Sequence, residues 1–187
     1  MTTTRSAADD ARELPREPTA RWITVLITGL VVVWLGVLAW QVTVLPERVP
    51  THFGSGGEPD GWSSKSGALA FSVLGPLLFA LPLPLMSLMV LRWPSSINAP
   101  NKQWWTATGP RLRRFERLMR EDLWLITAAM LATLIGVQVG ITGAAQTDDG
   151  RLPGLWLAGP LIVAFVGTGV VLARMYGSRY EEQSDLD

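Results

Sequence analysis

The chain has 187 residues, of which 48% are hydrophobic and only 17% are charged, and it contains nine tryptophans. This composition is too apolar for an ordinary soluble domain of that length and indicates a membrane protein. Basic and acidic residues balance at a formal net charge of zero, so bulk charge gives no reason to expect a nucleic-acid partner. Because the sequence has no cysteine, it excludes disulfides, thiolate metal sites and cysteine nucleophiles.

The two ends of the chain are predicted to be tails. Residues 1–20 are rich in Thr, Ala, Asp, Glu and Arg without apolar periodicity, so we expect a disordered cytoplasmic tail. Residues 178–187 form a second, acidic cytoplasmic tail. Residues 21–177 between them are predicted to be the membrane domain.

Four apolar stretches are long enough to cross a hydrocarbon core of about 30 Å, which takes roughly 20 residues of helix. The first is longer than the apolar core of a signal peptide, and no cleavage pattern follows it, so it is interpreted as a retained span. Three prolines are expected to bend the second span. The predicted fold is an all-α bundle of four transmembrane helices, with spans at about 22–45, 67–91, 123–145 and 155–173.

Basic residues are concentrated on one side of these spans. Thirteen of the sixteen lie in the N-terminal tail, the link between spans two and three, and the C-terminal tail, whereas Arg48, Lys65 and Arg151 lie in the other two links. Lysine and arginine are retained on the cytoplasmic side of a membrane. Both termini are therefore predicted to be cytoplasmic, and the first link to face outward.

The spans contain no ionisable residue away from their ends, and their polar residues are Thr, Ser, Gln41 and Gln138. Ionisable residues at membrane depth mark proton relays and ion pathways, so their lack argues against a proton-coupled pump. It also argues against an intramembrane protease, which needs an acid pair, a metal motif or a Ser/His pair.

Span three carries a stripe of small residues, one at every fourth position. Such a stripe allows another helix to approach closely. Two alternatives follow: packing within the bundle, or a homodimer formed through Gly136 and Gly140. The stripe consists of Ala128, Ala132, Gly136, Gly140 and Ala144.

The first link, residues 45–65, reads LPERVPTHFGSGGEPDGWSSK. Its glycines and prolines supply turn chemistry, so the segments on either side of them are predicted to pair as a short hairpin on the bilayer surface, with Trp62 at headgroup level. His52, the only histidine, has three alternatives: local bonding that orders the loop, pH sensing, or metal ligation with Glu58 and Asp60, a weak set for zinc. The candidate ligand-binding residues are His52, Phe53, Asp60, Trp62 and Lys65.

The second link, residues 95–124, combines a polar turn, an aromatic pair at Trp104 and Trp105, and a basic segment. From Pro110 onward, apolar residues recur at helical spacing among arginines, which predicts that span three begins as a basic amphipathic helix. Its arginines are expected to contact anionic lipids of the inner leaflet or to dock a cytoplasmic protein. The candidate partner-binding residues are Asn98, Asn101, Trp104, Arg113 and Arg117.

Both links together resemble the membrane family called domain of unknown function 1648. The resemblance covers roughly residues 22–105 and is carried by Pro-x-x-x-Pro-x-His-Phe, Gly-x-Pro-Asp-x-Trp and INAPNKQWW. Members include immunity proteins of Sdp-type toxin systems, so the resemblance implies a bacterial inner-membrane protein related to immunity or signalling, with no catalytic role established. The positions implied as family signature are Pro46, Pro50, His52, Phe53, Gly57, Asp60, Lys65, Asn98, Pro100, Asn101 and Trp104.

Two functions remain open at this point. The first is a non-enzymatic plasma-membrane protein that binds an extracytoplasmic ligand, a cytoplasmic partner or both. The second is an accessory subunit of a transporter or envelope enzyme complex. An enzyme is not expected, because neither link offers a nucleophile and base at a recognisable spacing, and no cofactor or metal is predicted.

Overall fold

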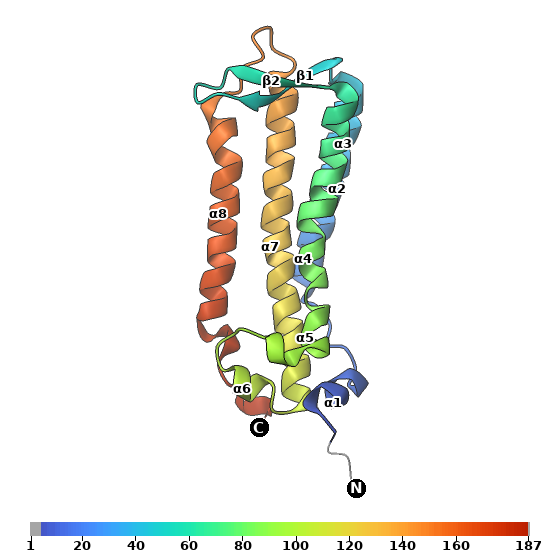
Figure 1. The fold of residues 1–187 in the computed structure, drawn as a ribbon, viewed down its shortest axis with the longest axis vertical. Helices are drawn as coiled ribbons and strands as arrows, with labels where there is room; N and C mark the ends of the chain where they lie inside the picture. The colour runs from blue at the N-terminus through green and yellow to red at the C-terminus, as the bar shows by residue number, and fades with distance from the viewer. Residues whose placement is uncertain (1–4, 187) are drawn as a thin grey trace.

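A computed structural model describes residues 5–186 and contains four long apolar helical segments (Figure 1). Each segment is long and apolar enough to cross a membrane, as expected from the hydropathy of the sequence. The chain is therefore a multi-pass membrane protein. The segments are α2 (Arg21–Val44), α3 to α5 (Lys65–Arg92), α7 (Gly109–Ala144) and α8 (Gly154–Tyr176).

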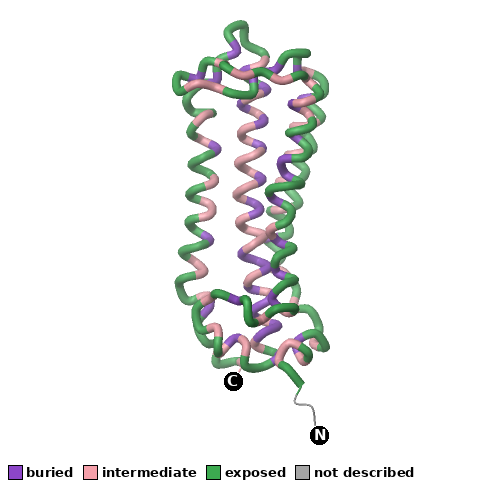
Figure 2. Tube along the Cα trace, viewed as in Figure 1, coloured by how far each residue is buried: buried purple, intermediate pink, exposed green. Residues whose placement is uncertain are grey.

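The α7 helix is the centre of the bundle. Half of its most apolar window is buried, whereas 11% of the corresponding windows of α2 and α8 is buried. Figure 2 shows this difference as a mostly buried or half-buried α7 beside a largely exposed α8. The long outward faces of α2 and α8 are thus left for lipid or for another membrane protein.

A two-stranded antiparallel sheet covers the end of the bundle opposite the two chain termini (Figure 1). Strands β1 (Arg48–Phe53) and β2 (Pro59–Ser64) pair with Pro50 opposite Trp62, and the register is irregular around His52. The predicted hairpin is confirmed. The fold is therefore not all-α, because the turn-rich link forms a small sheet.

The second span is a helix broken into α3 (Lys65–Gly75), the π-helical η1 (Pro76–Ala80), α4 (Pro82–Leu85) and α5 (Leu88–Arg92). A proline lacks the N–H that an α-helix aims at the carbonyl four residues earlier, so Pro76 and Pro84 leave the carbonyls of Ser72 and Ala80 without that donor. Neighbouring helices supply donors instead. Trp34 Nε1 and Gln138 Nε2 donate to Ser72 O, at 2.9 and 3.1 Å. The Thr127 hydroxyl shares its one proton between Ala80 O at 3.2 Å and Leu123 O, in its own helix, at 2.9 Å.

Gly136 and Gly140, two members of the small-residue stripe of α7, lie against α8 of the same chain. A Cβ added at Gly136 would lie 3.3 Å from Pro160 Cγ, and one at Gly140 would lie 3.2 Å from Trp156 Cβ. Close approach of α8 therefore uses both glycines for packing within the bundle. A homodimer through Gly136 and Gly140 would have to displace α8.

The end of the bundle that holds both termini is built around a compact apolar cluster. The N-terminal segment is not disordered as expected: α1 (Ala7–Glu13) packs Ala11 into this cluster, and the C-terminal segment packs Tyr180 there. Sequence composition missed both contacts because only a few apolar residues make them. The expected tail at residues 1–4 and 187 lies outside the described residues. The remaining short elements here are η2 (Pro94–Ser96), α6 (Lys102–Trp105), η3 (Ser178–Tyr180) and η4 (Ser184–Leu186).

Candidate functional site

The predicted site residues divide between the two ends of the bundle and form no single site (Figure 1). One group lies on or next to the hairpin and consists of His52, Phe53, Asp60, Trp62 and Lys65. The other lies at the end with the termini and consists of Asn98, Asn101, Trp104, Arg113 and Arg117.

On the hairpin, His52 makes a local contact. Its Nδ1 meets Asp60 Oδ1 across the two strands, and both side chains are exposed. Trp62 is also exposed and lies beneath the guanidinium of Arg48, 4.6 Å from the ring centroid. Phe53 is half-buried opposite Pro59, and Lys65 begins α3. These residues form a polar and aromatic outer surface.

The loop between α7 and α8 holds the hairpin from the side. Leu152 N donates to Gly57 O at 2.8 Å, and Arg151 Nη2 donates to Gly56 O at 2.9 Å. Gly57 has φ +83°, and a Cβ there would lie 2.1 Å from Leu152 O, so only glycine fits. The hairpin and this loop therefore form one joined cap.

A cavity of about 250 Å³ lies beneath the hairpin. Thr51 and Ser63 come from the two strands, and the remaining side chains come from α2, α3 and α7. Two of them, Gln41 and Gln138, are almost fully buried, with 1% and 2% of their surfaces exposed. The polar residues of spans one and three thus meet in one place. The full lining is Gln41, Thr51, Ser63, Gly67, Ala68, Phe71, Ser72, Gln138 and Ile141.

Both glutamines use their amide nitrogens and leave their amide oxygens unpaired. Gln41 Nε2 donates to Thr142 Oγ1 at 3.0 Å, and Gln138 Nε2 donates to Ser72 O at 3.1 Å. Oε1 of each glutamine is buried without a hydrogen-bond partner. An unpaired buried acceptor is unfavourable, so two of them beside one cavity indicate a place where a donor binds.

At the other end, two of the predicted residues, Asn101 and Trp104, have structural contacts. Asn101 takes the left-handed conformation at φ 53°, and its Nδ2 donates to Tyr180 O at 3.1 Å. Trp104 lies half-buried, with the Arg111 guanidinium 4.2 Å from its ring centroid. Asn98 is exposed at the rim of a second cavity, which Met86 and other methionines line.

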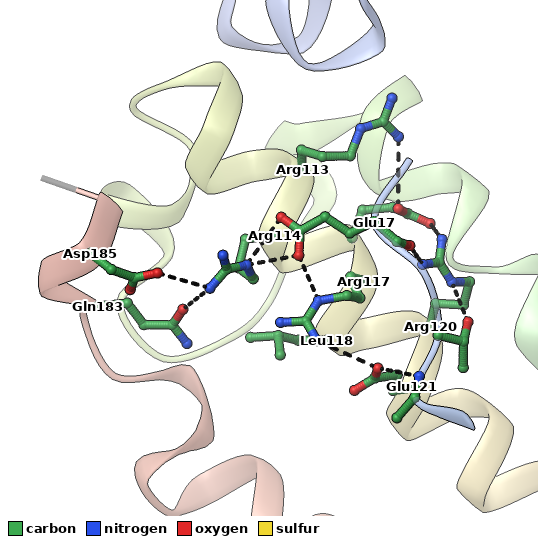
Figure 3. A network of polar contacts seen from close by, with 12 residues as sticks. Glu17, Arg113, Arg114, Arg117, Leu118, Arg120, Glu121, Gln183 and Asp185 are labelled. Atoms are coloured by element: carbon green, nitrogen blue, oxygen red, sulfur yellow. Dashed lines mark hydrogen bonds and ion pairs between the residues drawn. The ribbon is translucent and has the colours of Figure 1, made fainter. Parts of the chain in front are cut away.

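Four arginines of α7 are paired with acidic groups of the same chain, in the network of Figure 3: Arg113, Arg114, Arg117 and Arg120. Glu17 accepts from Arg114 Nε at 2.8 Å and forms an ion pair with Arg117 Nε at 2.7 Å. Arg120 donates to Glu116 at 2.6 Å, and Arg113 donates to the carbonyl of Leu14 at 2.9 Å. The N-terminal segment thus covers the basic face that was expected to meet lipid or a partner.

The C-terminal segment completes this ionic cluster. Arg179 donates to Asp122 Oδ2 at 2.9 Å and to Glu121 Oε2 at 2.7 Å, and the Tyr180 hydroxyl donates to Asp122 at 2.8 Å. Burial, and next the nearby Asp122 carboxylate, raise the pKa of the Tyr180 hydroxyl above its ordinary value. Both ends of the chain are therefore fastened to the start of α7.

Sequence reasoning noted Gln41 and Gln138 as polar residues within spans but did not assign them to a site. The sequence does show that each is a polar residue within a span, where burial without a hydrogen-bond partner is unfavourable. It does not show which residue is the partner. Glu17 and Asp122, which neutralise the arginines, gave no signal. Within residues 5–186, no three His, Asp or Glu side chains are placed to hold a metal ion.

Comparisons with known proteins bear on the hairpin half of the chain. Residues 27–75 match the family described as "Domain of unknown function (DUF1648)", from within α2 to the end of α3. An "Uncharacterized protein" of Archaeoglobus fulgidus is 29% identical over 161 residues, which cover 80% of this chain and 86% of the relative. No solved structure matches the chain. Residues 27–75, with the hairpin at their centre, are thus the part of this membrane protein that matches the DUF1648 family.

Proposed function

We propose that this chain is a non-enzymatic plasma-membrane protein that binds an extracytoplasmic ligand at its hairpin end. The hairpin faces outward, and both termini lie in the cytoplasm. This orientation rests on the thirteen basic residues that flank one end of the spans. A role in immunity to a secreted toxin, or in signalling, would use this ligand-binding end.

The observation that supports ligand binding at this end is the cavity beneath the hairpin, which is lined by Gln41 and Gln138, two residues whose buried amide oxygens have no hydrogen-bond partner. The opposite end offers less to a partner. The arginines of α7 there already have acidic or carbonyl partners within the chain, among them Glu17 for Arg114 and Arg117. A buried, paired charge is a poor docking group, because a partner would first have to break the existing pairs.

Cysteine labelling tests the orientation, because the sequence contains no cysteine of its own. A membrane-impermeant maleimide applied to intact cells should label Ser55→Cys, in the hairpin turn. Ser178→Cys, which follows α8, should be labelled only after permeabilisation. The reverse pattern would place the hairpin in the cytoplasm and refute an extracytoplasmic ligand.

A photoreactive amino acid in place of exposed His52 tests ligand capture. In living cells it should crosslink an extracytoplasmic molecule, and the crosslink should weaken when Trp62 is replaced by alanine. The same amino acid at exposed Gln103, at the other end, is the control and should not capture that molecule. Equal capture at both positions would show nonspecific reaction and count against the proposal.

An accessory-subunit role is the second candidate. A groove of about 430 Å³ lies between α2, α7 and α8, with Ala128 and Ala132 of the small-residue stripe in its wall. A helix of another membrane protein would gain packing contacts there. Purification under mild detergent would then recover one stoichiometric membrane partner, and Ala132→Leu would release it.

A further inference from the structure

We propose that the cavity beneath the hairpin binds a small, neutral, largely apolar molecule that carries hydrogen-bond donors, either hydroxyl or amide N–H groups. Its donors bind the Oε1 atoms of Gln41 and Gln138. The inference deepens the proposed function, on which it rests, by naming the class of ligand.

The hydrogen bonds fix which way each amide points. Ser72 O is a carbonyl and can only accept, so the group of Gln138 that lies 3.1 Å from it is the nitrogen. Thr142 Oγ1 donates its one proton to Gln138 O at 2.7 Å, so it accepts from Gln41 Nε2. Both oxygens are left as acceptors, and a flipped amide would break these bonds.

Two acceptors then need donors. Leaving one buried acceptor unpaired costs about 1–3 kcal/mol, so the fold retains two unfavourable groups at one place. The described side chains around them do not donate to either oxygen. A ligand that donates to these oxygens would recover that free energy on binding.

The charge of the lining selects a neutral ligand. No Asp, Glu, Lys, Arg or His is among the described residues that line the cavity. A cation would lack a counter-ion there, and an anion would face two oxygens of like partial charge. Phe71, Ala68 and Ile141 supply apolar wall for the remainder of the ligand.

The volume selects a small ligand. An apolar cavity of about 150 Å³ is enough to bind benzene. The cavity of about 250 Å³ therefore accommodates a single substituted ring or a group of that size. Resorcinol, an aromatic ring with two hydroxyl donors, is a suitable probe, and m-xylene has the same shape with methyl groups in place of the hydroxyls.

The experiment measures thermal unfolding of the purified full chain in lipid nanodiscs by circular dichroism. A ligand that binds only the folded state raises the unfolding midpoint as its concentration rises. Resorcinol should raise the midpoint by a few degrees and saturate, whereas m-xylene should not.

The double variant Gln41→Met/Gln138→Met should fold and lose the resorcinol shift. The variant removes the amide N–H groups that donate to the backbone carbonyls of Ser72 and Gln138. Both carbonyls keep a donor, because Trp34 still donates to Ser72 O and Thr142 still donates to Gln138 O. Gln146→Met, an exposed glutamine outside the cavity, is the matched control and should keep the shift. Thr51→Leu, at an exposed strand position, narrows the cavity without touching either glutamine and should also abolish the shift.

Several results would overturn the proposal. An equal shift with m-xylene would show an apolar cavity without donor recognition, and no shift at all would show that only water occupies it. Saturable stabilisation by sodium chloride, lost in the double variant, would indicate a cation site instead. The purified protein binds resorcinol whichever way it faces in cells, so this test can fail while the labelling of Ser55→Cys succeeds, and the reverse.

Discussion

Gly57 is the residue on which the joined cap of hairpin and α7–α8 loop depends. It combines a left-handed backbone, at φ +83°, with a carbonyl of the opposite loop placed where a side chain would start. Neither requirement can be predicted from the local sequence, because a glycine in a turn-rich stretch can be needed for several different turn conformations. The long-range contact to Leu152 decides among them.

Gly57→Ala should detach the α7–α8 loop from the hairpin. A strained left-handed residue alone costs about 1–3 kcal/mol, and the clash with Leu152 O adds to it. We expect a lower unfolding midpoint and faster hydrogen exchange at the Leu152 amide. Gly143→Ala is the control, since nothing lies within 4 Å of its added Cβ. Unchanged exchange at Leu152 in the Gly57 variant would contradict this account.

Ionisation of Tyr180 is expected to lower the stability of the fold at alkaline pH. Its hydroxyl stays protonated in the folded state because its pKa is raised, whereas in the unfolded chain it ionises near pH 10. The unfolded state then binds fewer protons, so stability should fall as pH rises above about 10. Below that pH the hydroxyl contributes its bond to Asp122 in full.

Tyr180→Phe should therefore be less stable at neutral pH, by about 1.5–3 kcal/mol for the lost hydrogen bond to the Asp122 carboxylate, whose Oδ2 keeps Arg179 as a donor, yet less sensitive to alkali. Unfolding midpoints of both proteins measured between about pH 8 and 11 separate the two effects. Every other residue is the same in the two proteins, so the difference between their curves reports the Tyr180 hydroxyl. Parallel curves would show that Tyr180 does not ionise on unfolding.

At the scale of elements, the second span is stable only among its neighbours. Pro76 and Pro84 each remove a backbone donor, and α2 and α7 return donors through side chains. Sequence predicted the bends, because the effect of proline is local. It did not predict Thr127 or Trp34 as the replacements, since their positions depend on how helices pack.

Thr127→Val should leave Ala80 O without its donor and destabilise the fold by about 0.6–1.7 kcal/mol, the range for such bonds in membranes. Adding Pro84→Ala supplies the missing N–H, so the double variant should recover much of the loss. Reversible unfolding in mixed detergent measures all three proteins. Thr133→Val is the control, because the carbonyls that it bonds, Ala129 and Pro160, have no proline four residues later. Strictly additive effects of the two changes would refute the link.

At the scale of the molecule, one end is fastened by charges and the other by backbone bonds. The ionic end ties residues 14–20 and 179–185 to the start of α7, and at the opposite end the cap joins the hairpin to the α7–α8 loop. Between these ends, α8 packs against α7 at Gly136 and Gly140, and Gly167 of α8 lies against Ala129.

Gly136→Leu tests that arrangement. Its side chain would meet Pro160, 3.3 Å from the first added carbon, and push α8 away at a cost of about 1–3 kcal/mol or more. We expect a marked loss of folded, monodisperse protein in size-exclusion chromatography. Gly169→Leu, with open space around it, should behave as wild type. A folded variant that changes only from dimer to monomer would favour dimerisation through the stripe.

Hydropathy was sufficient to place the four spans, and turn chemistry was sufficient to predict the hairpin. Both signals are local, one a long apolar run and the other a cluster of glycines and prolines around His52. The buried ionic cluster and the meeting of Gln41 with Gln138 were beyond reach, because they pair residues about 100 positions apart. Sequence identified polar groups that needed partners but could not choose the partners.

The proline-freed carbonyl at Ala80 also bears on how the nascent chain enters its membrane. Thr127, the donor for that carbonyl, is translated 47 residues later. A carbonyl without a hydrogen-bond donor is unfavourable in the hydrocarbon core. We therefore expect the second span to stay beside the insertion machinery until α7 has been translated. The second span and α7 should then move into the lipid together. Membrane insertion of the first half of the chain would thus depend on synthesis of α7.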